Sequence, residues 1–470
     1  MEGSDLTIAW RKFALLLLAV LTALTAACSS GSGGETSGSS GGDNVGEVSD
    51  ISGTVRVALA GWQLENGLDT QTGKKTVGLN DFLKNTFNKM YPNIKLELYQ
   101  IPWENVKAKQ SAMLLSKDVD VLYTGGAFAS QWYNEGLLRD IDDLIEADSS
   151  FDPSIYLEGI WNNSYSTKSP DGTKQFGIPA VLGRRMIIYD KKLFEDWGVE
   201  PLSDKPSPEE ILEKAKRMTG KNPKTGADNY GLHWSGNSLN GSTFVALTLA
   251  FGAPGAEGTL TDPKSITWKL NSPEMVKVME WIKEAAVLPP PGFVNGQGAE
   301  TFGLENNNIA IGIDTTGGAT MSEFMTNNNR ELLDRFEPVM NMGPNGEGWV
   351  AVDPFVMAKD AQNVEASWEV MKFLSGYETQ KYRYDNFAST PTLKNADFVS
   401  EEDKFIRMAL KIAEVGHSEL MDEANPFYMS DIVPAVNGFI SEAATGNAPD
   451  IQQFLDDLQQ RAEKWSANLK

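Results

Sequence analysis

Hydrophobic residues in this chain follow two alternating patterns, and this alternation constrains the fold more than any other feature of the sequence. A period of two, typical of strands, occurs in residues 55–59, 94–98 and 119–123. A helical period fills residues 79–90, between the first two strands, and Pro92 stops it. A β-α-β order of this kind predicts an α/β protein, with a sheet whose faces are covered by helices.

Each of these three strands ends in a segment suited to contact a ligand. Trp62 follows the first strand, Trp103 follows the second, and Thr124-Gly125-Gly126-Ala127-Phe128 follows the third. Because α/β sheets bind ligands beyond the carboxyl ends of their strands, we expect a binding site there. An indole ring can stack on a sugar, and Gly125-Gly126 would let the backbone approach a ligand closely. Packed tryptophans and an ordinary turn are the alternatives.

Further helices have recognisable start signals. Ser207 and Ser272 each precede a proline and can cap helices, and Glu210 can complete a capping box with Ser207. Asn363 can cap a later helix, which Gly376 can end. Strands are also predicted over residues 186–189, 309–313 and 350–357.

The first 27 residues have the pattern of a secretory signal peptide. Arg11 and Lys12 precede an apolar stretch from Phe13 to Leu24, which closes with the small residues Thr25, Ala26 and Ala27. This stretch is too short to span a bilayer comfortably. We therefore expect an exported protein that loses residues 1–27.

Cys28 is the only cysteine of the chain. Its place directly after the small residues resembles the lipobox of bacterial lipoproteins, which implies lipidation by chains such as palmitate and anchoring to the cell membrane, as on a Gram-positive surface. The alternative is an ordinary signal peptide with a chance cysteine. Residues 28–52 are rich in Ser and Gly, and we expect them to form a disordered tether.

The length, the net charge and the residue types of the chain limit its possible architecture, partners and sites. About 420 residues follow the tether, more than one hydrophobic core usually holds, so two lobes are expected. The net charge of −23 disfavours nucleic acid as a partner, because nucleic-acid binding requires clustered Lys and Arg. The two histidines, His233 and His417, lie too far apart in sequence to suggest a zinc site or a catalytic triad. No P-loop or EF-hand pattern is present, and no cofactor or metal is predicted.

Four blocks of sequence occur in a specific order along the chain. They are a helix leading to Tyr91-Pro92-Asn93-Ile94, a turn at Gly136-Leu137-Leu138, a crossover from Phe176 to Gly198, and a helix from Asn363 to Leu374. Together they span nearly the whole chain after the tether. In this order they resemble the extracellular solute-binding proteins of ABC importers, in the sugar-binding group that includes maltose-binding protein.

The resemblance implies a two-lobed periplasmic-binding-protein-like fold of type II, with a hinged cleft between the lobes. Such a cleft needs stacking faces and aimed hydrogen bonds but no catalytic group. The implied activity is to bind a sugar or oligosaccharide by hinge closure and deliver it to ABC permease subunits, as a monomer and not as an enzyme. The expected N-terminal lobe is 53–178 with 354–391, the expected C-terminal lobe is 179–353 with 392–470, and hinge crossings are expected near 177–181, 350–357 and 390–394.

The same resemblance suggests ligand contacts in the second lobe. Arg184 can offer paired donors, although a salt bridge is equally compatible with its position. Trp234 and Asn237 belong to a polar loop, and Asp314 can accept two hydrogen bonds from hydroxyls. Gly317 stands where the family commonly has a stacking tryptophan, so that platform is absent from this chain.

The predicted role of the remaining tryptophans depends on whether they lie near a hinge crossing or within a predicted helix. Trp349 and Asp353 flank the second crossing, where Trp349 is a candidate replacement platform, and Tyr428 lies where a late helix begins. All three are predicted ligand contacts. Four tryptophans in helical contexts are expected to pack instead: Trp197, Trp281, Trp368 and Trp465.

Several alternative functions remain open at this stage. The same fold can bind a peptide, a polyamine or a metal complex, although Trp and amide side chains near the cleft loops favour neutral polyols over cations. An exported glycosidase is a second alternative, because any two of the 64 acidic residues could form a catalytic pair. A sensor ectodomain that reports sugar to a kinase is a third.

Overall fold

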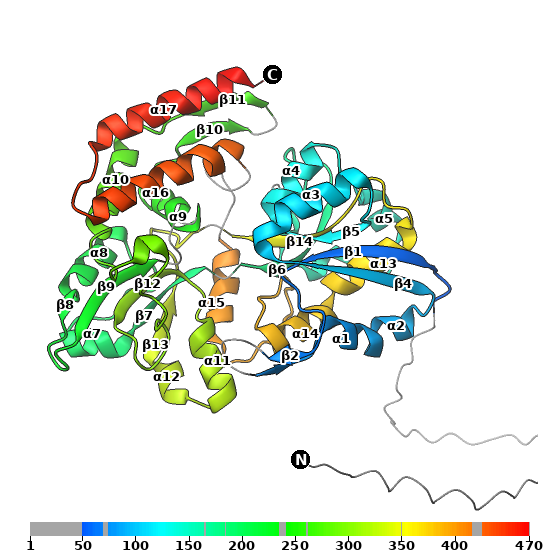
Figure 1. Cartoon of the computed structure of the whole chain (residues 1–470), viewed down its shortest axis with the longest axis horizontal. Helices are drawn as coiled ribbons and strands as arrows, with labels where there is room; N and C mark the ends of the chain where they lie inside the picture. Colours follow the sequence, from blue (N-terminus) through cyan, green and yellow to red (C-terminus); the bar gives the residue numbers. More distant parts are fainter. Residues whose placement is uncertain are drawn as a thin grey trace, which may run out of the picture. The chain divides into compact units, whose positions relative to one another are not determined.

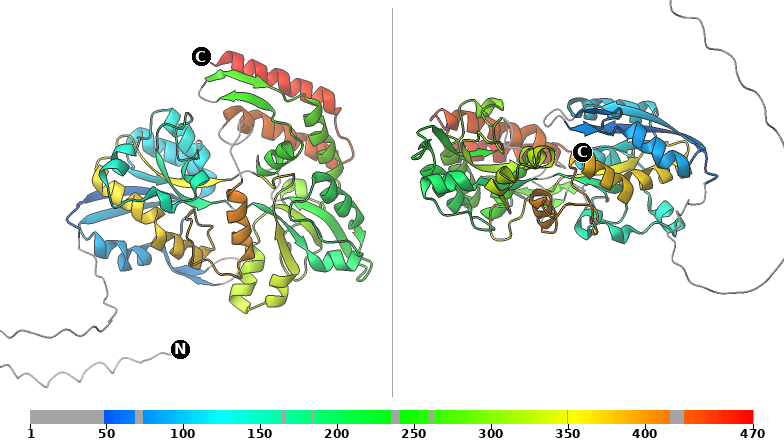
Figure 2. Two further views of the ribbon diagram at one scale, coloured as in Figure 1. Left: turned by 180° about the vertical axis from the view of Figure 1, so that it is seen from behind. Right: turned by 90° about the horizontal axis from the view of Figure 1, so that it is seen from below.

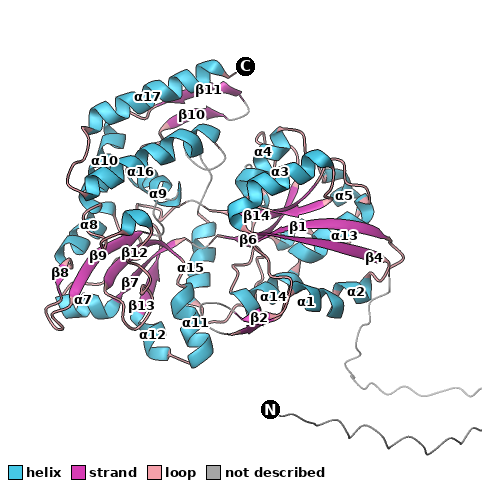
Figure 3. Cartoon of the chain, viewed as in Figure 1, coloured by secondary structure: helices cyan, strands magenta, loops and turns pink. Residues whose placement is uncertain are grey.

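The computed structural model describes residues 49–68, 74–163, 166–183, 185–234, 241–259, 262–348, 350–415 and 425–469. These residues form two five-stranded sheets, each covered by its own helices, and two small two-stranded sheets (Figure 1). We call the two large assemblies the first and the second lobe. Figure 2 shows them from two further directions, and Figure 3 separates helices from strands by colour.

The sheet of the first lobe has the strand order β4-β1-β5-β14-β6. Strand β1 pairs in parallel with β4 and β5, which confirms the three strands predicted near the N-terminus. Strand β14 is antiparallel to both β5 and β6, so β5 and β6 run in the same direction. The carboxyl ends of β1, β4, β5 and β6 therefore lie at one edge. The strands are β1 (Gly53–Ala60), β4 (Ile94–Ile101), β5 (Val121–Tyr123), β6 (Gly177–Leu182) and β14 (Val352–Met357).

Helices bury the strands of the first lobe on both faces. Val55, Val57 and Leu59 on one face of β1 and Ala58 on the other are fully buried, and helix α13 contacts β1, β5, β6 and β14. Burial on both faces is typical of a largely parallel sheet. The helices are α1 (Leu79–Asn85), α2 (Phe87–Met90), α3 (Val106–Ser116), α4 (Gly126–Asn134), α5 (Asp142–Ala147), α6 (Glu158–Trp161), α13 (Val364–Ser375) and α14 (Tyr377–Phe387), with short 3₁₀ helices η1 (Trp103–Asn105) and η2 (Pro153–Ile155) and a hairpin of β2 (Gly67–Leu68) and β3 (Lys75–Thr76).

The sheet of the second lobe has the strand order β13-β7-β12-β9-β8. Strands β9 and β12 are parallel, whereas β7 is antiparallel to β12 and β13. Thr315 at the end of β12 pairs with Met186 at the start of β7. The carboxyl ends of β9 and β12 therefore lie at the edge where the chain arrives from the first lobe. The strands are β7 (Met186–Asp190), β8 (Gly220–Lys221), β9 (Asp228–Trp234), β12 (Ile309–Thr315) and β13 (Phe336–Val339).

The second lobe carries more helices and a hairpin that packs on the last of them. Strand β11 of this hairpin contacts α17 (Figure 1). The elements are α7 (Lys191–Trp197), α8 (Pro208–Arg217), α9 (Gly241–Ala250), β10 (Ala256–Thr259), β11 (Asp262–Trp268), α10 (Pro273–Ala285), η3 (Phe293–Asn295), α11 (Gly318–Asn327), α12 (Arg330–Arg335), α15 (Lys404–Ala413), η4 (Tyr428–Ile432), α16 (Val433–Ala444) and α17 (Ile451–Asn468).

The helix-start predictions are partly confirmed. Ser207 Oγ accepts a hydrogen bond from Glu210 N at the start of α8, and Ser272 Oγ accepts one from Met275 N at the start of α10. The predicted capping box is wrong, because the Glu210 carboxylate instead accepts hydrogen bonds from the backbone N and the hydroxyl of Ser203.

The predicted Asn363 cap is also wrong. Helix α13 begins after Asn363, but the Asn363 amide donates to Thr54 O at 2.7 Å, so this side chain ties the helix to β1 and does not cap it. Gly376 follows the end of α13, as predicted, with an extended backbone. The four tryptophans expected to pack do so: Trp281 and Trp368 are each 4% exposed, and Trp197 and Trp465 are partly buried against the core of the second lobe.

Three chain segments lie side by side between the lobes. Leu182 at the end of β6 pairs with Val352 of β14 and with Thr390. Leu182 N donates to Thr390 O at 3.0 Å, and Gly183 N donates to Ala351 O at 2.9 Å. A small hydrophobic cluster covers this junction and includes Ile160 from the first lobe and Ala413 from the second. These are the segments in which hinge crossings were expected; the residue boundaries of the lobes stay a prediction.

Among the helices of the described ranges, none combines the length and apolar character needed to span a bilayer.

Gly126 lies where the loop after β5 meets strand β14. A Cβ atom at Gly126 would lie 2.2 Å from Ser166 Oγ and 2.5 Å from Val352 O. At Gly125 the nearest atom to such a Cβ would be Phe128 Cδ2, at an ordinary 3.6 Å. The close backbone approach at Gly126 is thus to the hinge strand, and Gly125 is under no such constraint.

We predict that Gly126→Ala lowers the free energy of unfolding by about 1–3 kcal/mol, because the added methyl group forces β14 or Ser166 to move. Gly125→Ala is the matched control and should change it by less than about 0.5 kcal/mol. Urea unfolding of both variants measures the difference. Equal stabilities would contradict this account of the loop.

Candidate ligand-binding site

The carboxyl edge of the first sheet gathers the three segments that were predicted to contact ligand. Trp62 follows β1, Trp103 opens η1 after β4, and Thr124 follows β5. Because β6 runs in the same direction and continues into the second lobe, this edge faces that lobe. The structure therefore brings these three residues together, and whether they bind ligand stays a prediction.

The indole of Trp62 is enclosed by protein. Trp62 is 1% exposed, with Tyr123 and Phe355 packed edge-on at centroid distances of 5.3 Å and 5.8 Å. The guanidinium carbon of Arg383 lies 4.2 Å from its ring centroid. In this conformation the ring has no free face for a sugar, because an arginine already stacks on it.

Trp103 is the exposed indole at the same edge. It is 44% exposed and meets Tyr123 edge-on at 6.2 Å. Trp103 and Phe128 flank Gly125, since a Cβ there would lie 3.8 Å from Trp103 Cζ3 and 3.6 Å from Phe128 Cδ2. Among the predicted platforms within the described residues, Trp103 is thus the one that still has an open surface.

Arg383 belongs to this edge and was not predicted from the sequence. Thr379, Arg383 and Phe387 are spaced by four residues along α14, which puts them on one face of the helix. The guanidinium also lies 5.6 Å from the Phe387 ring and 5.9 Å from the Tyr123 ring. Desolvation by burial lowers the pKa of Arg383. The four-residue spacing was the available signal, but it does not show what the helix packs against.

Tyr123 and Asp353 form a polar pair beside Trp62. The Tyr123 hydroxyl donates to the Asp353 carboxylate at 3.0 Å, and burial raises the pKa of Tyr123 well above its usual value. The pairing of β14 with β6 shifts register between Asp353 and Pro354, at the predicted contact Asp353. Tyr123, which was not predicted, links this carboxylate to the aromatic cluster.

The loop after β5 is partly buried. Thr124 is fully buried, and its backbone N donates to Pro354 O at 3.2 Å. Gly125 precedes α4, and Phe128 on that helix is half-buried beside Trp132. Of these residues, Phe128 offers the largest accessible apolar surface.

In the second lobe, the described candidates turn mostly inward. Trp234 ends β9, is 1% exposed and packs perpendicular to Phe293 at 5.2 Å. Tyr428 begins the π-helical turn η4 and is fully buried near Phe244. Both rings belong to the hydrophobic core of this lobe, so neither has an exposed face in this conformation.

Asp314 lies at the end of β12 with φ of 58° and is 2% exposed. Arg185 Nε lies 3.6 Å from its carboxylate. A Cβ at the nearby Gly317, whose φ is +66°, would lie 2.3 Å from the Phe405 ring. The Phe405 ring explains why a glycine occupies the position where the family resemblance led us to look for a tryptophan.

Four predicted residues lie outside the described residues: Arg184, Asn237, Trp349 and the lipidation candidate Cys28.

A pocket of about 510 Å³ is lined by residues of both lobes. Its volume lies within the range of small-molecule sites. Phe128 is the predicted ligand contact in its wall, and Met429, which is 43% exposed, faces it from η4. None of the described residues in its lining is acidic. They are Lys107, Ala127, Phe128 and Gln131 from α3 and α4, with Pro426, Met429 and Ser430 around η4.

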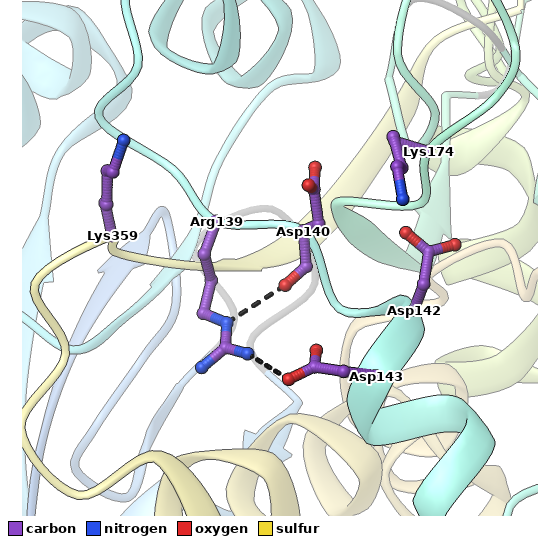
Figure 4. A pocket seen from close by; sticks show the side chains of 6 residues that line it. All are labelled: Arg139, Asp140, Asp142, Asp143, Lys174 and Lys359. Atoms are coloured by element: carbon purple, nitrogen blue, oxygen red, sulfur yellow. Dashed lines mark hydrogen bonds and ion pairs between the residues drawn. The ribbon is translucent and has the colours of Figure 1, made fainter.

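A second pocket, of about 390 Å³, lies at the opposite edge of the first sheet (Figure 4). Arg139 N donates to Met357 O, at the far end of β14 from Asp353. The Arg139 guanidinium donates to the Asp143 carboxylate at 2.6 Å and to Asp140 O at 2.9 Å. Three acidic and three basic residues line this pocket, and it is separate from the candidate site.

Sequence comparison identifies related proteins. The family described as bacterial extracellular solute-binding protein matches residues 72–381. A curated relative from Brucella abortus, described only as a binding protein, is 20% identical over 301 residues, which cover 62% of this chain and 67% of the relative. The family match covers well over half of the chain.

Solved structures share the fold. An ABC substrate-binding protein from Listeria monocytogenes, in complex with cycloalternan, has a TM-score of 0.66 at 18% identity and covers 89% of this chain and 100% of its own. The sugar-binding protein MalE from Xanthomonas citri has a TM-score of 0.65 at 16% identity, covering 88% and 98%. A solute-binding protein from Agrobacterium vitis with bound D-mannitol has a TM-score of 0.62 at 20% identity, also covering 88% and 98%. These likenesses confirm the predicted two-lobed α/β fold.

We predict that Trp62→Ala lowers the free energy of unfolding by about 3 kcal/mol or more, because it empties a fully buried site and leaves Arg383 without its stacking partner. Trp103→Ala should cost less than about 1 kcal/mol, because this ring is largely exposed. Urea unfolding of both variants makes the comparison. Equal costs would show that the two indoles have been assigned the wrong environments.

Proposed function

Because the chain belongs to the bacterial extracellular solute-binding protein family, we propose that it captures a carbohydrate outside the membrane and delivers it to an ABC permease. Membership of an extracellular family implies an extracytoplasmic location. The proposal adds that lipidated Cys28 and the tether over residues 28–52 hold the protein, as a monomer, at the cell membrane.

The observation that carries the proposal is the pocket between the lobes. It combines an aromatic ring, a thioether and polar groups, with Phe128 and Gln131 on α4 and Met429 and Ser430 around η4. Trp103 and Phe128 both lie close to Gly125. Apolar rings that cover sugar C–H faces, beside a few hydrogen-bonding groups, make a wall suited to a carbohydrate.

Hinge closure supplies the signal in this proposal. A ligand that contacts both lobes stabilises the closed state by its differential affinity for that state over the open one. The segments around Leu182, Val352 and Thr390 can absorb the change, because a hinge needs only a few residues to alter their backbone angles. The closed protein is then the form that the permease recognises.

The structural relatives support a carbohydrate as the cargo. The protein from Listeria monocytogenes is in complex with cycloalternan, the one from Agrobacterium vitis holds D-mannitol, and that from Xanthomonas citri is described as sugar-binding. The first is a cyclic oligosaccharide and the second a sugar alcohol. They share a surface of hydroxyl groups, and the proposed ligand class is defined by that chemistry.

We predict that the purified protein is stabilised by at least one glycan in a thermal-shift panel of neutral and acidic oligosaccharides. A ligand at 100 times its Kd should add about 2.7 kcal/mol to the free energy of unfolding.

Met429→Ala should weaken that binding by about tenfold, because this side chain lines the pocket. Met325→Ala is the matched control: Met325 is 41% exposed on α11, away from the pocket lining, and its loss should leave affinity unchanged.

Chromatography of the incubated glycan tests the enzyme alternative in the same samples. The bound glycan should be recovered intact, because a binding protein needs no catalytic pair. Release of new reducing ends, or the absence of a shift with every glycan, would refute the proposal.

A further inference from the structure

Arg383 is unlike the other arginines in the described part of the chain. Its side chain has neither an ion pair nor a hydrogen bond there, and its Nε is buried without a partner. By comparison, Arg56 pairs with Asp120, and Arg335 pairs with Asp190. Arg407, which has no ion pair, still donates to the carbonyl groups of Val399 and Ser400. A half-buried guanidinium without an acceptor is costly to maintain.

The surroundings of Arg383 hold the cation in place but do not neutralise it. Trp62 stacks under it at 4.2 Å, and the Phe387 and Tyr123 rings stand at 5.6 Å and 5.9 Å. Asp353 is near enough to attract the guanidinium, but it lies beyond ion-pairing distance and accepts the Tyr123 hydroxyl. Stacking fixes the plane of the guanidinium, so its donors have a defined direction before any ligand binds.

The charge of the described residues that line the pocket between the lobes has the same sign as that of Arg383. The chain has 64 acidic and 41 basic residues, yet among the described residues that line this pocket none is acidic, and Lys107 is the one that carries a charge. The pocket at the opposite edge of the sheet differs, because three acidic and three basic residues line it (Figure 4). The described part of the wall of the pocket between the lobes therefore carries a positive charge and no negative one, which suits an anionic ligand.

We propose that Arg383 is a specificity-determining residue that binds an anionic group of the ligand, and that the ligand is an acidic carbohydrate such as a uronic-acid oligosaccharide. This inference rests on the proposed function and names its ligand class. It departs from the neutral polyol that the sequence favoured. A carboxylate matches the two-pronged donor geometry of a guanidinium, whereas a pair of hydroxyls accepts the hydrogen bonds without compensating the desolvated charge.

The net charge of −23 does not oppose this assignment at close range. Charges separated by more than about 8 Å are largely screened at physiological ionic strength, whereas a half-buried contact is screened much less. Long-range repulsion therefore lowers the association rate at low salt, and the groups in contact with the ligand set the preference between anion and neutral analogue.

The test compares uronic-acid oligosaccharides with their methyl esters, which keep the sugar rings and remove the charge. Isothermal titration calorimetry at 0.15 M salt is run on the wild-type protein with oligomers of galacturonate, glucuronate and mannuronate, each beside its ester, and with neutral oligosaccharides. We expect at least one acid to bind about tenfold or more tightly than its ester and than any neutral glycan, because charge-assisted hydrogen bonds are the stronger ones.

Arg383→Gln should reduce that ratio to about twofold and leave the affinity for the ester within about twofold of wild type, because only the charge-dependent contact is lost. Arg407→Gln, which removes an exposed arginine without an ion pair, is the matched control and should keep the full ratio. Thermal unfolding of the free variants checks that they fold; if Arg383→Gln does not, Arg383→Met, which can retain the packing on Trp62, takes its place.

Tighter binding of a neutral glycan or an ester by the wild-type protein would overturn the inference. So would an equal loss of acid and ester binding in the Arg383 variant, because that result would make Arg383 a purely structural support. Neither result would affect the proposed function. Failure of every glycan, acidic and neutral, to bind would instead refute the proposed function itself.

Discussion

The hydrogen bonds around Leu182 join the chain segments that pass between the lobes, and the rest of the structure depends on them. Leu182 pairs with both Val352 and Thr390, and Gly183 N donates to Ala351 O. Since β6 runs with β5 and leads into β7, the carboxyl edges of both sheets face the junction. A hinge built this way can bend while each lobe keeps its own core.

Local patterns predicted the fold well because they depend on neighbouring residues. The period-two runs at 55–59 and 94–98 became β1 and β4, and Ser207 and Ser272 cap their helices. The failures involve partners outside the local sequence pattern. Asn363 bonds to Thr54, far away in sequence, and Ser203 in the preceding loop takes the Glu210 carboxylate from its expected role. No spacing rule reveals such competition.

The candidate site, too, could be predicted only in part from local sequence patterns. Strand exits placed Trp62 and Trp103 at one edge, but only packing shows that the first is buried and the second exposed. Arg383, which stacks on Trp62, lies in α14, far from Trp62 in sequence. The candidate site therefore combines a buried base of aromatic rings and one guanidinium with a more accessible wall of Trp103 and Phe128. A preformed base of this kind reduces the entropic cost of binding.

The distance between the lobes, with and without ligand, tests the central claim most directly. Cys28→Ser removes the native thiol, and spin labels at Leu115 and Val287, which are 69% and 55% exposed, report on the first and the second lobe. Labels at Leu115 and Met90, both in the first lobe, serve as the control pair. Pulsed electron resonance should show that a saturating glycan shortens the interlobe distance and leaves the control unchanged. Tight binding with both distances unchanged would contradict a receptor that works by hinge closure.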